Sequence, residues 1–254
     1  MFSVLDMFTI GVGPSSSHTV GPMCAAQAFA SSLEESGAVS RVGRIRVVLY
    51  GSLSLTGLGH GTDRAILAGL EGNVPATVDT DYLLSVRERC AHDGTIHVNG
   101  TNAIAYDDDG DMVFDRWKRL APHPNGMRFQ AFDAQGNIID EQVWYSIGGG
   151  FIRRGRIDDA LISNHEQTPA SSQSPEDSGN DEAAEYGDGV PYPFVSCDGL
   201  IDLCRKHHLS IADVVWANET ARRSPQEVRD RLTRIWNVMS HCICLLYTSD
   251  AADE

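Results

Sequence analysis

Residues 44–50 read RIRVVLY, and GSLSLTGLGHGTD follows them directly at residues 51–63. In the first stretch, charged and apolar residues alternate and are followed by the apolar run Val47-Val48-Leu49, a pattern typical of a buried β-strand. The second is rich in Gly, Ser and Thr, and residues 64–69 after it have a helical pattern. We therefore expect a strand joined to a helix by a loop, within an α+β fold built from a mixed sheet and helices.

His60 lies in this loop between Gly57, Gly59 and Gly61. Such spacing indicates backbone that needs room or positive φ around an exposed imidazole. A flexible loop with a solvent-facing histidine is the alternative.

A second loop of the same type reads GPSSSHT at residues 13–19, directly before a run of small and apolar residues that predicts a helix over 20–35. Free backbone N–H groups and the helix macrodipole would favour a carboxylate or phosphate there. Plain capping is the alternative, although one cap satisfies only one or two donors. A hydrolase nucleophile is a weaker alternative interpretation, because the side chains of adjacent Ser17 and His18 diverge and no G-x-S-x-G elbow is present. We expect the two loops to form one pocket.

Short alternating segments at 96–98, 128–133 and 143–146 predict antiparallel strands separated by Gly/Asn/Asp turns. His123-Pro-Asn-Gly126 lies among them, and a surface turn would use the same residues. Gly148–Gly150 after the last segment indicate a nest of free N–H groups.

Composition favours a small organic ligand. The 254 residues carry 20 Lys and Arg against 35 Asp and Glu, a net charge of -15, which argues against nucleic-acid or anionic-membrane partners. No signal peptide or membrane span is evident, so we expect a cytoplasmic protein. The six cysteines form neither a disulfide framework nor a complete metal site.

The predicted α+β domain covers residues 1–163, and an acidic disordered linker covers 164–189. Amphipathic patterns at 196–208, 210–221 and 224–241 then predict the start of an all-α domain over 190–243, with Ser210 and Asp213 in capping-box positions. Trp216 and Trp236 are expected to anchor its core.

The last residues, 244–254, read CLLYTSDAADE and lose the helical period. They resemble the translated read-through of a transposase-type sequencing adapter, so we expect a non-native tail on an N-terminal fragment.

Five motifs together resemble the bacterial single-chain iron-sulfur L-serine dehydratases, also called L-serine ammonia-lyases. In chain order they are GPSSSHTVGPM (13–23), YGSLSLTGLGHGTD (50–63), HPNGM (123–127), YSIGGGF (145–151) and VPYPF (190–194). The resemblance implies a first domain similar to the substrate-binding regulatory domain of some phosphoglycerate dehydrogenases, followed by a helical catalytic domain. The acidic insertion near 166–189 is longer than is usual in the family.

In that family L-serine becomes pyruvate and ammonia, a step of amino-acid catabolism and gluconeogenesis. A [4Fe-4S] cluster held by three cysteines acts as a Lewis acid on the substrate hydroxyl. None of the six cysteines of this chain matches a cluster position, so the resemblance assigns no metal ligand here and implies that this chain alone is inactive. The resemblance is also compatible with a homodimer.

The resemblance assigns His60 and His123 to catalysis, since an imidazole near neutrality suits proton transfer. The residues expected to bind the substrate are Ser15, Ser16, Ser17, His18, Thr19, Ser52, Ser54, Thr56, Gly57, Asp63, Asn125, Gly148, Gly149 and Gly150. A non-catalytic amino-acid-binding regulatory module is the alternative function.

Overall fold

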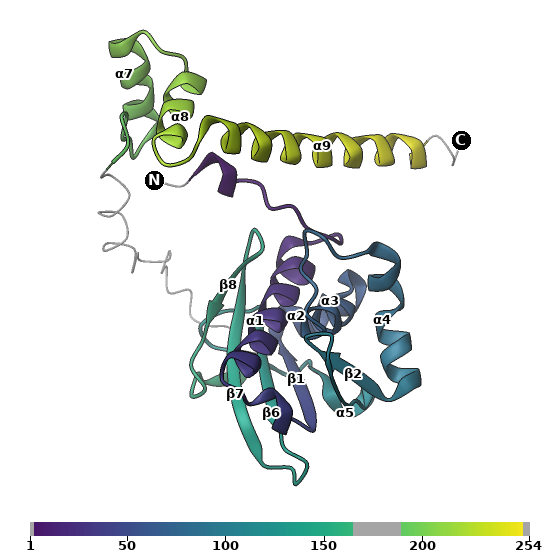
Figure 1. Ribbon diagram of the computed structural model, residues 1–254. Helices are drawn as coiled ribbons and strands as arrows, with labels where there is room; N and C mark the ends of the chain where they lie inside the picture. The colour runs from purple at the N-terminus through teal and green to yellow at the C-terminus, as the bar shows by residue number, and fades with distance from the viewer. Residues whose placement is uncertain (1–2, 165–188, 251–254) are drawn as a thin grey trace. The chain divides into compact units, whose positions relative to one another are not determined.

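The computed structural model describes residues 3–164 and 189–250, with side chains described as far as Cys244. The chain forms two compact units (Figure 1). One comprises Gly11–Pro169, and the other combines Met1–Ile10 with Ala170–Glu254. Each is described by itself.

The Gly11–Pro169 unit is built around β1, Arg44–Tyr50, at the centre of a mixed sheet. β1 pairs antiparallel with β6 and parallel with β3 and β4, and the main strand order is β2-β3-β1-β6-β7-β8. The other strands of this sheet are β2 (Thr95–Val98), β3 (Asn102–Ala105), β4 (Met112–Asp115), β6 (Gly126–Phe132), β7 (Ile138–Gly148) and β8 (Phe151–Arg154). The predicted strand at 44–50 is thus confirmed, and the sheet is mixed as expected.

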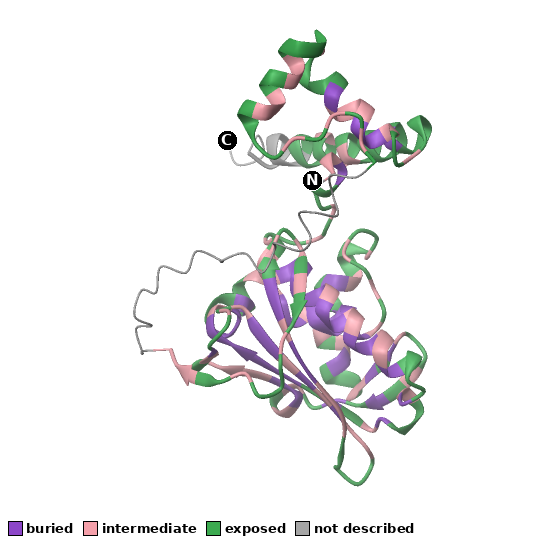
Figure 2. Cartoon of the chain, turned by 90° about the vertical axis from the view of Figure 1, so that its left-hand side faces the viewer, coloured by how far each residue is buried: buried purple, intermediate pink, exposed green. Residues whose placement is uncertain are grey.

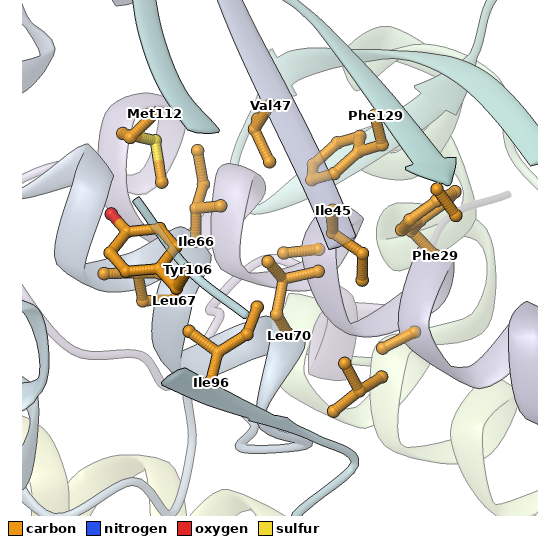
Figure 3. Packing of buried hydrophobic residues seen from close by; sticks show 14 of the residues in the cluster. Phe29, Ile45, Val47, Ile66, Leu67, Leu70, Ile96, Tyr106, Met112 and Phe129 are labelled. Carbon is orange, nitrogen blue, oxygen red and sulfur yellow. The ribbon is translucent and has the colours of Figure 1, made fainter. Parts of the chain in front are cut away.

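Helices cover one face of this sheet (Figure 1). They are α1 (Gly21–Glu35), α3 (Thr62–Leu70) and α4 (Thr80–Asp93). Ile45, Val47 and Leu49 of β1 point into the core with these helices because alternate residues of a strand share a face. The rings of Phe29 and Phe129 stack with centroids 5.2 Å apart in the same core (Figure 3).

The opposite face of the sheet carries a smaller apolar cluster that includes Val48, Tyr50, Val143 and Tyr145. A two-stranded sheet of β5 (Lys118–Leu120) and β9 (Leu161–Ser163) adds Leu120 to it. Figure 2 shows the resulting distribution, with the buried residues concentrated in the strands and on the sheet-facing sides of the helices.

Two segments differ from the sequence-based expectation. Residues 51–60 are helical instead of forming a loop: α2 spans Gly51–Thr56, and a 3-10 turn, η4, spans Gly57–His60. Helix α4 was not predicted, because its charged residues leave only Leu83, Val86 and Cys90 buried. The remaining short elements are α5 (Asp108–Asp111) and the turns η1 (Val4–Asp6), η2 (Ser16–Val20) and η3 (Val39–Arg41).

The other unit is helical, with α7 at Cys197–His207, α8 at Ile211–Thr220 and α9 at Pro225–Asp250. The predicted capping box is present: the Ser210 hydroxyl accepts from Asp213 N–H, and the Asp213 carboxylate accepts from Ser210 N–H. The N-terminal segment belongs to this unit, since Ser3 Oγ and Val4 N–H each donate to Glu219 at 2.9 Å. Sequence patterns carried no signal for that contact.

Two expectations for this unit were wrong. Trp236 is 63% exposed and Trp216 is only partly buried, under the Arg229 guanidinium at 5.2 Å, so the tryptophans do not anchor the core. Helix α9 continues to Asp250, beyond the helix predicted over 224–241. The predicted acidic linker at 164–189 lies almost entirely outside the described residues. Among the helices that the structure describes, none is long and apolar enough to cross a membrane.

Candidate active site

His18 is the centre of a hydrogen-bonded cluster at the start of α1. It lies in η2, a single π-helical turn that follows the Gly/Ser-rich loop. Its Nε2 lies 3.0 Å from Ser52 Oγ, its Nδ1 lies 2.9 Å from Ser17 Oγ, and its backbone N–H donates to Ser15 Oγ at 3.2 Å. The two segments predicted as loops therefore meet through one imidazole.

The position of Ser52 depends on the glycine before it. Gly51 follows β1 with φ of +56°, and a Cβ there would approach the carbonyl oxygen of Pro124 to 2.3 Å. Ser52 N–H donates to that same oxygen at 2.9 Å. Glycine thus allows the His123–Gly126 turn to lie directly against the start of α2.

His60 lies beside His18, with ring centroids 4.9 Å apart. Its Nδ1 is 2.9 Å from the carbonyl oxygen of Thr56, one turn back at the end of α2. Two backbone contacts secure the neighbourhood: Thr19 Oγ1 donates to His60 O at 2.9 Å, and Thr62 Oγ1 donates to His18 O. Each loop therefore holds the main chain of the other.

His123 is held by its own turn. Its Nδ1 accepts the N–H of Asn125 at 3.1 Å, and its ring lies 6.1 Å from that of Tyr145. Asn125 is in turn tied to β7, because its Nδ2 donates to Ser146 O at 3.2 Å and its carbonyl accepts Ser146 N–H at 3.1 Å. A third predicted motif is thereby joined to the cluster.

The electrostatic surroundings favour neutral rings at two of these histidines. Burial lowers the pKa of His18, and the neighbouring His60 lowers it further, against an opposing hydrogen bond from Ser52. Burial also lowers the pKa of His123, and the nearby positive charge of Arg153 adds to this. Both rings are therefore suited to proton exchange or hydrogen bonding as neutral imidazoles near pH 7.

Ser146 is a site residue that the sequence analysis missed. It is fully buried, and its Oγ has no hydrogen-bond partner among the described residues. A Cβ on Gly21 would approach this Oγ to 2.1 Å, so the serine packs directly against the first residue of α1. The only sequence signal was its place beside the glycine run.

Other predicted residues have local partners. Ser54 Oγ donates to Gly51 O at 2.8 Å, and Thr56 Oγ1 donates to Ser52 O at 2.9 Å, so both hydroxyls satisfy carbonyls of α2. Gly57 is buried with no room for a side chain, because a Cβ would meet Thr62 Oγ1 at 2.9 Å. Ser16 is exposed on η2.

The surroundings of Asp63 differ most from those expected of a ligand-binding carboxylate. It is 3% exposed on the first turn of α3, and its Oδ2 accepts from Arg87 of α4. Arg87 also donates to Asp108, with Nη2 2.8 Å from Oδ2. Asp63 thus belongs to an ion-pair network that joins α3, α4 and α5.

Gly148, Gly149 and Gly150 form the β7–β8 hairpin turn, with φ of +97°, +61° and +82°. Three successive positive φ values explain why glycine occupies each position. The strand β7 reaches the histidine cluster through Ser146, two residues before this turn.

The fifth motif lies in the helical unit. Tyr192 N–H donates to Asn218 Oδ1 at 2.9 Å, and Asn218 Nδ2 donates to Tyr192 O at 2.8 Å. The motif therefore docks its own segment onto α8.

A metal centre would need a converging set of ligands. In the parts of the chain that the structure describes, no three His, Cys, Asp or Glu side chains lie close enough to hold a metal ion. None of the described cysteines, at 24, 90, 197, 204, 242 and 244, forms a disulfide, and burial raises the pKa of both Cys24 and Cys90. The described residues therefore do not fit an iron-sulfur cluster.

The Gly11–Pro169 unit is thus a mixed α+β sheet domain in which a serine-rich helix start meets two turns that carry histidines. Comparison with known families gives a match to the family described as Serine dehydratase beta chain over residues 3–156. The chain belongs to this family.

Full-length relatives are also similar to it. The chain is 41% identical over 241 residues to an L-serine dehydratase of Streptomyces coelicolor, covering 95% of this chain and 49% of that protein. It is 38% identical over 247 residues to L-serine dehydratase 1 of Escherichia coli, covering 96% and 48%. The chain thus spans about half the length of these relatives.

Proposed function

We propose that the protein to which this chain belongs is an L-serine ammonia-lyase that converts L-serine to pyruvate and ammonia. The observation that carries the proposal is the meeting of three separate motifs around His18: Ser52 bonds its ring, His60 lies against it, and the His123 turn abuts Ser52 through Pro124. The names of the relatives support serine as the substrate.

The start of η2 is the proposed grip on the substrate carboxylate. Ser15, Ser16 and Ser17 supply hydroxyls there, and the first N–H groups of a helical turn lack acceptors within the turn. Ser52, Thr56 and Asn125 lie on the adjoining segments, where their hydroxyl and amide groups would complete the polar surroundings of an amino acid.

His60 and His123 are the proposed proton-transfer groups. Loss of the α-proton from L-serine and departure of the β-hydroxyl leave aminoacrylate, which hydrolyses to pyruvate and ammonia. A positioned imidazole near neutrality typically accelerates such a proton transfer by about 10²–10⁴-fold.

The family resemblance adds a [4Fe-4S] cluster as Lewis acid for the leaving hydroxyl. The described residues offer no ligand set for it, so in this proposal its ligands come from a longer form of the protein. Cytoplasmic location and dimer formation likewise remain predictions.

The test is pyruvate formation from L-serine by a full-length form, reconstituted anaerobically with iron and sulfide. We expect turnover that falls at least about 10²-fold in His60→Ala and in His123→Ala. A cluster-loaded full-length protein without turnover would contradict the proposal. Tight L-serine binding by the present chain combined with that result would favour the amino-acid-binding module.

A further inference from the structure

Tyr145 of β7 lies beside the His123 turn. The rings of the two residues are 6.1 Å apart, and Tyr145 is 1% exposed. Gly126, which ends the turn and begins β6, pairs with Tyr145 in the β6–β7 register. The position of the tyrosine ring therefore defines part of the surroundings of His123.

The segment after β8 holds this ring. Tyr145 Oη donates to Asp159 Oδ2 at 2.6 Å, and the same oxygen accepts the N–H of Arg156 at 2.8 Å. Gly155 allows a close approach, because a Cβ there would come within 2.5 Å of Tyr145 Cε2. Tyr145 is thus held by a hydrogen bond and by close packing.

Arg153 contacts the same ring from β8. It pairs with Tyr145 in the β7–β8 register, and its Cζ lies 5.5 Å from the centre of the tyrosine ring. This is a cation–π geometry. Carboxylates pair with other arginines of this region, but no carboxylate of the described residues pairs with Arg153. The contact therefore brings a positive charge without an ion-pair partner close to His123.

Other charged groups near His123 come from two further segments. Asp159 is negative, but its Oδ2 already accepts two hydrogen bonds. Arg119 of β5 packs beside Gly51, where the carbonyl of Pro124 also lies, and is positive like Arg153. Burial lowers the pKa of His123, and Arg153 is the charge that lowers it further.

We propose that Arg153 is a positioning residue for His123: it holds Tyr145 from β8 and brings a positive charge that favours the neutral imidazole. A neutral ring has a lone pair on Nδ1, which accepts the N–H of Asn125 at 3.1 Å. Arg153 therefore also favours the turn conformation that ties Asn125 to β7. Its consequence for catalysis rests on the proposed lyase function, whereas its effect on the ring does not.

The next residue in the sequence supplies a matched control. Arg154 is exposed like Arg153, but it points to the opposite face of the sheet, where its Cζ lies 5.9 Å from the centre of the Trp144 ring. Arg153→Gln and Arg154→Gln remove the same charge from adjacent exposed positions of an edge strand, so both variants should fold. Arg153→Lys keeps the charge but loses the planar guanidinium.

The test is an NMR titration of the histidine rings in the 254-residue chain, with ¹⁵N-labelled histidine, between about pH 5 and about pH 8.5. His123→Gln assigns the His123 signals by their loss. We expect the titration midpoint of His123 to move to higher pH in Arg153→Gln and to stay near the wild-type value in Arg153→Lys and in Arg154→Gln. High salt should move the wild-type midpoint toward that of Arg153→Gln, because salt screens an exposed charge.

An unchanged His123 midpoint in Arg153→Gln would overturn the inference, and so would an equal rise in Arg154→Gln. A rise in Arg153→Lys as large as that in Arg153→Gln would also overturn it, because the charge would then not be the cause. None of these outcomes bears on the lyase proposal, which depends on pyruvate formation.

In a full-length form, the pH profile separates this role from a merely structural one. If neutral His123 takes part in the proposed reaction, the acidic limb of kcat/KM for L-serine should move to higher pH in Arg153→Gln. Arg154→Gln should keep the wild-type profile. A lower rate at every pH in Arg153→Gln, with an unmoved profile, would contradict the positioning role.

Discussion

Ser52 Oγ lies 3.0 Å from His18 Nε2, although the two residues are 34 positions apart in the sequence. The contact joins the second residue of α2 to the turn before α1. Since His18 also bonds Ser17 and contacts His60, its ring holds both predicted helix starts in one cluster.

Replacing Ser52 by Ala should weaken L-serine binding more than replacing Ser54. Ser52→Ala leaves His18 Nε2 without its hydroxyl partner and should cost about 1 kcal/mol of unfolding free energy. Ser54→Ala removes a hydroxyl that, among the described residues, bonds to Gly51 O within its own helix, so it is a matched control. Calorimetric titration of both variants with L-serine measures the difference, and equal affinities would argue against a ligand role for Ser52.

The Gly21–Ser146 contact predicts a strong coupling between two substitutions. A Cβ at Gly21 would approach Ser146 Oγ to 2.1 Å, so Gly21→Ala should destabilise the fold by roughly 1–3 kcal/mol despite the better helix propensity of Ala. Ser146→Gly in the same chain should restore most of this loss.

Urea unfolding of the two single variants and the double variant measures that coupling. Gly59→Ala is the control, because nothing lies within 4 Å of a Cβ there. Additive effects of the two substitutions would show that the contact does not exist.

Arg87 should contribute strongly to stability. Arg87→Met leaves the buried carboxylate of Asp63 without its partner, and we expect a loss of roughly 2 kcal/mol or more. Arg156→Met is the control, because Arg156 pairs with Asp158 at an exposed site and should change stability little. Thermal and urea unfolding would contradict the prediction if both variants unfolded alike.

The pH dependence of stability should carry a contribution from His123. Its folded-state pKa is lowered by burial and by Arg153. Below about pH 6.5 this histidine is therefore protonated in the unfolded chain while it is still neutral in the folded chain. This contribution is therefore fully present above that pH and is lost as the pH falls toward the folded-state pKa.

Urea unfolding between pH 7.5 and 5.5 measures this slope. His123→Gln should flatten it, whereas His92→Gln, at an 88% exposed side chain, should leave it unchanged. An unchanged slope in His123→Gln would contradict the lowered pKa.

The sequence predicted strands and helices best where local pattern and burial agree. The apolar run at 47–49 became the core of β1, and Ser210 with Asp213 formed the expected capping box, because both signals are local. The loop predicted for residues 51–60 was wrong, since this segment rich in Gly, Ser and Thr folds into α2 and η4 under tertiary packing. Glycine content alone does not decide backbone conformation when Leu53 has a buried site to fill.

The sequence by itself determined which three segments hold the residues that we propose for the chemistry: a serine-rich helix start, a histidine between glycines, and a stiff His-Pro-Asn-Gly turn. Only the tertiary structure decided that these segments meet and that Asp63 pairs with Arg87. It also decided that Nδ1 of His60 lies against a backbone carbonyl, whereas Nδ1 of His123 lies against a backbone N–H. The physical reason is that residue type sets what a side chain is able to bind, whereas the partner it binds depends on chain segments brought together by folding of the sheet and its helices.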